Sequence, residues 1–187
     1  MKYSVQNYFE RHKQVMDTID IKSIDNISQI IKKKFIEGKK ILTCGNGGSA
    51  YNASHFITDW NKFINLSTGK NFFGFSLNDN IGLITAYAND LSYDDVFKGQ
   101  LKNLMNKDDL LICISGSGNS KNVVKAAEYA NEIGADLVSL VGFDGGKLKK
   151  ISKNFVHVLC EDMQICEDIH LMIGHMIMKS ICSSDIF

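Results

Sequence analysis

Two segments of the chain contain residue types that bind metal ions or transfer protons. His55 and Asp59 are four residues apart in a predicted helix, so their side chains share one face. A second predicted helix, near the C-terminus, contains two acids and two histidines: Glu167, Asp168, His170 and His175. Imidazole and carboxylate groups are ligands of Zn²⁺, and they are equally the acids and bases of proton-transfer enzymes. If the two helices pack together, they can form either kind of site.

Spacing along the second helix leaves the choice of acid open. Asp168 is seven residues from His175, so the two share a helix face, and Glu167, eight residues away, is offset by less than a quarter turn. The alternative is structural: His170 faces solvent, and His175 is a core histidine with a satisfied hydrogen bond.

A glycine-rich turn precedes the helix that contains His55. Residues 40–49 have the sequence KILTCGNGGS, which predicts the end of a buried strand, a tight turn, and a helix that opens with Ser49 and runs to Trp60. Free amide groups at such a helix start form an anion site. The alternative is a strand, turn and helix with two polar surface residues and no ligand.

A second turn of similar type covers residues 115–120, with the sequence SGSGNS, followed by Lys121 at the start of another predicted helix. Its hydroxyl and amide groups suit a sugar phosphate. Neither turn matches a P-loop or a dinucleotide fingerprint. Taken alone, this turn is explained equally well by ordinary turn and capping chemistry. Two such turns after neighbouring strands favour ligand binding.

The elements that position these residues alternate between strand and helix. Helices are predicted at 4–18, 23–37 (with Ser23 as N-cap), 49–60, 79–88, 93–106, 121–133, 147–151 and 164–182, and strands at 41–42, 72–77, 110–114, 136–141 and 155–159. This alternation predicts an α/β fold with a parallel sheet covered on both faces, and ligands at the carboxyl ends of its strands. Two helices before the first strand are more than one face of the sheet needs, so we expect the first helix to pack against another subunit.

Composition excludes several classes of protein. A chain of 187 residues predicts one domain, and 21 basic and 21 acidic residues give no general attraction to nucleic acid or to an anionic membrane. Five cysteines, an odd number with no C-x-x-C pair, fit a cytoplasmic protein better than a disulfide scaffold. The N-terminus lacks an apolar signal core, and no apolar run reaches the length of a membrane span.

Several separated motifs together resemble the sugar isomerase (SIS) domain family, most closely its phosphoheptose isomerase branch. They are CGNGGS at 44–49, His55, Asn89-Asp90, ISGSGNS at 114–120, DGGK at 144–147 and the helix ending in Ile173-Gly174-His175. The resemblance implies one SIS domain over 1–187, with N-terminal helices at 1–38 and a flavodoxin-like core of five parallel strands at 39–187. It further implies a homotetramer with sites between subunits. The implied activity converts sedoheptulose 7-phosphate to D-glycero-D-manno-heptose 7-phosphate for lipopolysaccharide or capsule synthesis.

The resemblance also assigns roles to individual residues. Asp59 and His175 fall on the family's acid/base pair. The zinc positions correspond to His55, Asp59, Glu167 and His175. The implied substrate contacts are Asn46, Gly47, Gly48, Ser49, Asn89, Asp90, Ser115, Gly116, Ser117, Ser120 and Glu167.

The chain departs from the family pattern at four places. Asp59 replaces a glutamate, Glu167 replaces a glutamine, and Gly116 replaces a threonine. The usual arginine after the histidine is absent, and Lys62 is the candidate substitute cation. Two alternatives therefore stay open: an isomerase of another sugar phosphate, or a non-catalytic SIS protein that acts as a tether or binds sugar phosphates. The retained acid and histidines favour an enzyme.

Overall fold

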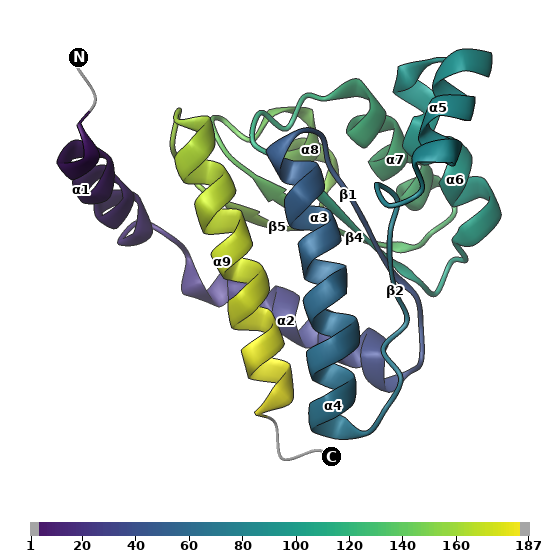
Figure 1. Cartoon of the computed structure of the whole chain (residues 1–187), viewed down its shortest axis with the longest axis horizontal. Helices are drawn as coiled ribbons and strands as arrows, with labels where there is room; N and C mark the ends of the chain where they lie inside the picture. The colour runs from purple at the N-terminus through teal and green to yellow at the C-terminus, as the bar shows by residue number, and fades with distance from the viewer. Residues whose placement is uncertain (1–3, 184–187) are drawn as a thin grey trace.

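The computed structural model describes residues 4–183, whose centre is a sheet of five parallel strands (Figure 1). The strand order is β2-β1-β3-β4-β5, which is the flavodoxin-like order. The predicted parallel α/β fold is therefore confirmed. The strands are β1 (Ile41–Cys44), β2 (Gly74–Ser76), β3 (Leu110–Ser115), β4 (Asp136–Val141) and β5 (Asn154–His157).

Alternating side chains divide the core into two layers, one on each face of the sheet. Ile41 and Leu110 point to one face, where they pack with three helices: α2 (Ile21–Ile36), α3 (Gly48–Asp59) and α9 (Met163–Cys182). Their sequence neighbours Leu42 and Leu111 point to the other face, as the two-residue period of a strand requires. That face is covered mainly by α6 (Val96–Leu104), α7 (Lys121–Glu132) and α8 (Gly146–Ile151).

The predicted helix at 49–60 is longer than expected. After α3 the chain continues as a π-helix, η1 (Trp60–Ile64), and then as α4 (Asn65–Thr68). The predicted helix at 93–106 is divided into a 3₁₀ turn, η2 (Tyr93–Asp95), and α6. The remaining helices are α1 (Val5–Met16) and α5 (Ile81–Asp90).

Two predicted helix starts were wrong, by two residues for α2 and by one residue for α3. The N-cap of α2 is Asp20, whose carboxylate accepts a hydrogen bond from the Lys22 amide at 3.0 Å, so the helix begins before Ser23. Helix α3 is preceded by Gly47, whose φ of 55° places it in the left-handed region that favours glycine. Ser49 consequently lies inside the first turn and is buried.

Helix α1 extends away from the rest of the molecule (Figure 1). Its Val5 and Phe9 side chains are exposed, whereas Val15 at its C-terminal end joins the core. The Tyr8 hydroxyl donates a hydrogen bond to the Asp168 carboxylate on α9 at 2.5 Å. Packing of this helix on another subunit stays a prediction, which the exposed apolar side chains support.

All five cysteines are free, as expected from their number and spacing. Cys44 and Cys113 lie in register on neighbouring strands, buried, with their sulfur atoms 3.8 Å apart. Burial raises the pKa of the Cys113 thiol, which keeps this group protonated and unreactive. No helix within residues 4–183 is long and apolar enough to cross a membrane.

Candidate active site

Helices α3 and α9 lie side by side on one face of the sheet, and their close contact forms the base of the site (Figure 1). The contact occurs at Gly174, where an added Cβ would lie 2.1 Å from the nearest ring carbon of Phe56. The Trp60 indole donates a hydrogen bond to the Gly174 carbonyl at 3.1 Å, and its ring stacks on Phe56 with centroids 5.2 Å apart. Glycine at 174 therefore permits the two helices to approach closely.

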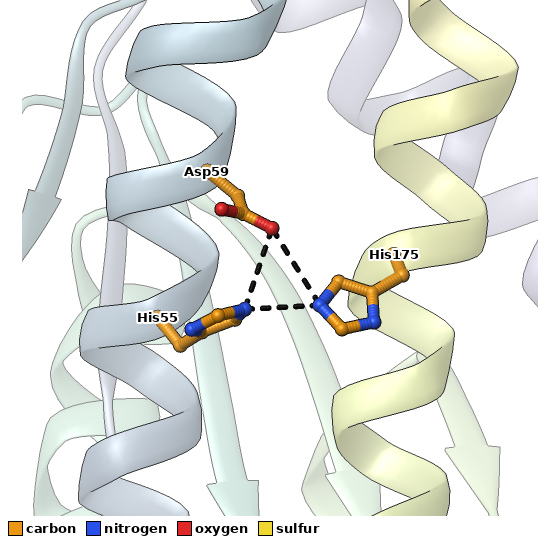
Figure 2. Close-up of side chains that lie close together, drawn as sticks. All are labelled: His55, Asp59 and His175. Atoms are coloured by element: carbon orange, nitrogen blue, oxygen red, sulfur yellow. Dashed lines mark hydrogen bonds and ion pairs between the residues drawn. The ribbon is translucent and has the colours of Figure 1, made fainter.

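This approach brings His55 and Asp59 of α3 to His175 of α9 (Figure 2). The Nε2 atoms of the two histidines are 2.9 Å apart. One oxygen of Asp59, Oδ2, lies 3.3 Å from His55 Nε2 and 3.5 Å from His175 Nε2. The imidazoles are 44% and 45% exposed, whereas the carboxylate is 18% exposed, so the cluster opens to the surface above a half-buried acid.

The three donor atoms fit a metal ion. Tetrahedral Zn²⁺ with ligands at about 2.0–2.1 Å keeps its donor atoms about 3.3 Å apart, which matches the two carboxylate–imidazole distances. Two imidazole nitrogens facing each other at 2.9 Å either share one proton or share a cation. The structure therefore brings together a candidate metal site, which is also a candidate acid/base site.

Glu167, predicted as a fourth ligand, lies outside this cluster in the structure. Eight residues separate it from His175, which is about 12 Å along a helix axis. Its carboxylate instead contacts Gly48 at the start of α3. Burial, with a smaller contribution from Asp168, raises the pKa of the Glu167 carboxyl.

The other two candidates of α9 are resolved by their contacts. Asp168 faces α1 and accepts the Tyr8 hydrogen bond. His170 is fully buried and neither of its ring nitrogens has a hydrogen-bond partner within the described residues, while the His175 side chain is nearly half exposed. The structural alternative for this helix predicted an exposed His170 and a core His175. It was wrong in both parts, because His170 is buried and His175 is partly exposed.

The two glycine and serine turns converge on one cavity of about 230 Å³. It lies at the carboxyl ends of β1 and β3, where the amide groups at the starts of α3 and α7 are gathered. Nine of the ten residues that line it were predicted as substrate contacts. The lining residues are Asn46, Gly47, Gly48, Ser49, Ser115, Gly116, Ser117, Ser120, Met163 and Glu167.

The Asn46 side chain is locked by an amide pair. Its Nδ2 donates to Asn122 Oδ1 at 2.8 Å, and Asn122 Nδ2 donates back to Asn46 Oδ1 at 2.9 Å. The Tyr93 hydroxyl donates a third hydrogen bond to the same Asn46 oxygen. These contacts fix the first turn against the start of α7.

Asn89 and Asp90 are not brought into this cavity. Both are exposed at the end of α5, where Asn89 donates a hydrogen bond to Asp90 at 2.9 Å. Lys62, the candidate substitute cation, points its ammonium toward the Phe63 ring, 5.1 Å from the ring centroid.

Cavity and cluster are linked by the same two helices. Gly48 borders the cavity and His55 belongs to the cluster, seven residues further along α3, which is about 10 Å of helix. Along α9, Glu167 borders the cavity and His175 belongs to the cluster, eight residues or about 12 Å further along the helix. An anion site and an acid/base site are thus held at a fixed separation by a rigid helix pair.

Sequence reasoning missed the residues that support the site. Trp60, Met163, Tyr93 and Asn122 carry no recognisable chemical motif. One signal was available: Trp60 follows Phe56 by four residues, which places both aromatic rings on the face that packs against α9.

Comparison with known proteins gives a consistent result. Residues 7–142 match the family described as SIS domain. A phosphoheptose isomerase of Helicobacter pylori (strain P12) is 37% identical over 180 residues, which is 92% of this chain and 91% of the relative. A probable phosphoheptose isomerase of Thermoplasma volcanium is 34% identical over 179 residues, which is 96% of this chain and 91% of the relative.

A solved structure agrees with these relatives. Phosphoheptose isomerase GmhA from Neisseria gonorrhoeae superposes with a TM-score of 0.88 at 29% identity, covering 96% of this chain and 97% of that chain. The chain therefore belongs to the SIS domain family, in the branch formed by the phosphoheptose isomerases.

Proposed function

We propose that this protein is an aldose–ketose isomerase that converts sedoheptulose 7-phosphate to D-glycero-D-manno-heptose 7-phosphate for surface polysaccharide synthesis. Relatives named phosphoheptose isomerase, similar over nearly the whole chain, support the substrate class. The proposal rests mainly on the Asp59 carboxylate, which lies between two imidazoles. Asp59 is at the end of α3, and the anion cavity is at the start of the same helix.

The phosphate end of the substrate is proposed to bind in the cavity. Amide groups at the starts of α3 and α7 and the hydroxyls of Ser117 and Ser120 supply donors there. The remaining sugar chain then extends along α3 and α9 toward His55 and His175. In this arrangement the anion site fixes one end of the substrate and orients the carbonyl end at the cluster.

Asp59 is proposed as the base. It removes a proton from carbon 1 of the ketose and returns it to carbon 2, while the proton of the carbon 1 hydroxyl moves to the oxygen on carbon 2. His175, 3.5 Å from the carboxylate, is placed to move that oxygen-bound proton. Aspartate is one methylene shorter than the family's glutamate, and the close approach of α9 at Gly174 supports the same contact with the shorter acid.

We propose zinc as the cofactor, held by His55, Asp59 and His175. A bound zinc ion supplies Lewis-acid polarisation of the substrate carbonyl. The donor set of two imidazoles and a carboxylate, with separations near 3.3 Å, supports this choice.

A cytoplasmic homotetramer with sites between subunits is also proposed. The free cysteines support the compartment, because they suit a reducing environment. The exposed Val5 and Phe9 of α1 and the open histidine cluster support burial by a neighbouring subunit. Asn89 and Asp90, outside the cavity of their own chain, are proposed to complete a site in this assembly.

The experiment is steady-state isomerisation of sedoheptulose 7-phosphate by the purified protein. Asp59→Asn and His175→Ala are each expected to lower kcat by at least about 100-fold, the usual contribution of an acid or base. Asp168→Asn removes a carboxylate from the same helix outside the cluster and serves as the matched control.

The outcomes separate the alternatives. Turnover of a different ketose phosphate alone would keep the reaction class and replace the substrate. If folded, tetrameric protein turns over no ketose phosphate, the proposed activity is wrong and a tether or binding role takes its place.

A further inference from the structure

Trp60 directly follows Asp59 in sequence, and its hydrogen-bond acceptor, Gly174, directly precedes His175. The indole is 1% exposed and is enclosed by the rings of Phe56 and Phe72, with centroid distances of 5.2 and 6.0 Å. Its hydrogen bond to the Gly174 carbonyl is therefore shielded from water. This one contact joins the side chain that follows the acid to the backbone carbonyl that precedes the histidine.

The opposite side of the same segment is also fixed. Asn61, the next residue, donates from Nδ2 to the Gly74 carbonyl at 3.0 Å and accepts from the Gly74 amide at 3.1 Å. Its side-chain amide thus pairs with edge strand β2 as a neighbouring strand would. Asp59 is consequently followed by two residues that hold the chain to α9 on one side and to the sheet on the other.

Both anchors lie at the start of a π-helix. Residues 60–64 form η1, in which i→i+5 backbone hydrogen bonds replace the i→i+4 bonds of an α-helix, immediately after Asp59. Such π segments are frequent at functional sites. In this protein the segment places Trp60 toward α9 and Asn61 toward β2.

We propose that Trp60 is a positioning residue that sets the distance between Asp59 and His175. It is not among the residues that line the cavity or form the cluster, and it acts by fixing α9 against the end of α3. The expected effect on catalysis rests on the proposed isomerase function, whereas the expected effect on the geometry of the cluster rests only on the contacts of Trp60 and Asn61.

The test uses Trp60→Phe in the full-length protein. Phenylalanine keeps an aromatic ring between Phe56 and Phe72 and removes only the N–H donor and the second ring. Phe97→Leu is the matched control, because Phe97 is also 1% exposed but lies in the core layer on the other face of the sheet. Both variants are expected to lower the thermal midpoint.

Two readouts separate positioning from general destabilisation. The first is Co²⁺ titration followed by visible absorption, which reports the affinity and coordination geometry of the His55, Asp59 and His175 set. The second is the division of the effect between kcat and KM. For Trp60→Phe we expect about a 10-fold weaker Co²⁺ affinity and about a 10-fold lower kcat, with KM within about 2-fold, since the cavity is untouched.

Phe97→Leu is expected to leave both readouts at the wild-type value. Equal Co²⁺ affinity and kcat for Trp60→Phe and wild type would overturn the proposal, and so would equal losses in the two variants. If wild type binds Co²⁺ but does not isomerise, the proposed function fails while the cobalt comparison still tests Trp60. If wild type neither binds Co²⁺ nor isomerises the substrate, the proposal is overturned as well, since there would be no site for Trp60 to position.

Discussion

Replacement of Gly174 by alanine tests whether the close approach of α3 and α9 creates the site. An added Cβ would lie 2.1, 2.4 and 2.7 Å from three ring carbons of Phe56. Ordinary contact begins at 3.4 Å, so the ring or the helix must move by about 1.3 Å, the difference between 3.4 and 2.1 Å. Phe56 is 1% exposed and stacked on Trp60, so the ring has little room to move.

Two opposing effects determine the size of the change. Alanine is favoured over glycine inside a helix by about 1 kcal/mol. Overpacking of a core costs about 1–3 kcal/mol, and a contact this short belongs at the upper end. We therefore expect a net loss of about 2 kcal/mol in the free energy of unfolding. A shift near 1 Å between Asp59 and His175 is expected to lower kcat by about 100-fold.

Urea unfolding and steady-state isomerisation measure the two effects. Gly82→Ala is the control, because Gly82 is also helical but its Cβ would meet only the Asn80 side-chain oxygen, at 3.2 Å. A second variant, Gly174→Ala with Phe56→Leu, gives the new methyl group space and is expected to recover part of the lost kcat. Stability and kcat of Gly174→Ala equal to those of wild type would refute the reasoning.

Three further predictions concern separate parts of the molecule. Burial lowers the pKa of His170 to about 4, below the usual value of 6.5, so the unfolded chain takes up this proton first as the pH falls. The free energy of unfolding then falls between about pH 6.5 and 4, by about 2 kcal/mol at pH 5. Urea midpoints measured over this pH range should show the fall in wild type and not in His170→Leu. The same pH dependence in both proteins would contradict a buried, neutral His170. Asn122→Ala removes the partner of Asn46 and is expected to raise KM with kcat nearly unchanged, so a fall in kcat alone in steady-state kinetics would count against a cavity role. Dialysis against a chelator should abolish turnover, and about one equivalent of Zn²⁺ per chain should restore it; undiminished turnover of metal-free protein would rule out the proposed zinc role.

The central strands were predictable because their sequences are mainly apolar. β3 and β4 match the predicted ranges to within one residue, since strands buried on both faces favour apolar side chains at most positions. The edge strand β2 is shorter than predicted. Phe73 and Phe75 at this edge are each 44% exposed, and such aromatic residues resemble core residues in sequence.

Helical periodicity could have shown which of the two histidines of α9 is buried. His170 belongs to a row of residues at four-residue spacing with Cys166, Gly174 and Met178, all buried. His175 follows Glu167 and Leu171 in the adjacent, partly exposed row. Counting these rows assigns His170 to the core, whereas composition alone does not.

Other features depend on contacts that no local pattern encodes. The π-helix after Asp59 breaks the regular 3.6-residue period, so the continuation of the helix to Thr68 could not be predicted from the sequence. The position of Glu167 against Gly48 depends on how two helices distant in sequence start at one cavity. Such long-range geometry comes only from the folded chain.

The most direct test of the central claim is proton NMR of the purified protein with sedoheptulose 7-phosphate in D₂O, with and without Zn²⁺. The account predicts a new aldose anomeric signal and deuterium at the carbon next to the carbonyl, because Asp59 exchanges its proton with solvent during transfer. Asp59→Asn should show neither signal. Absence of both conversion and exchange in folded, tetrameric wild-type protein would contradict the assignment of Asp59, His55 and His175 as an isomerase site.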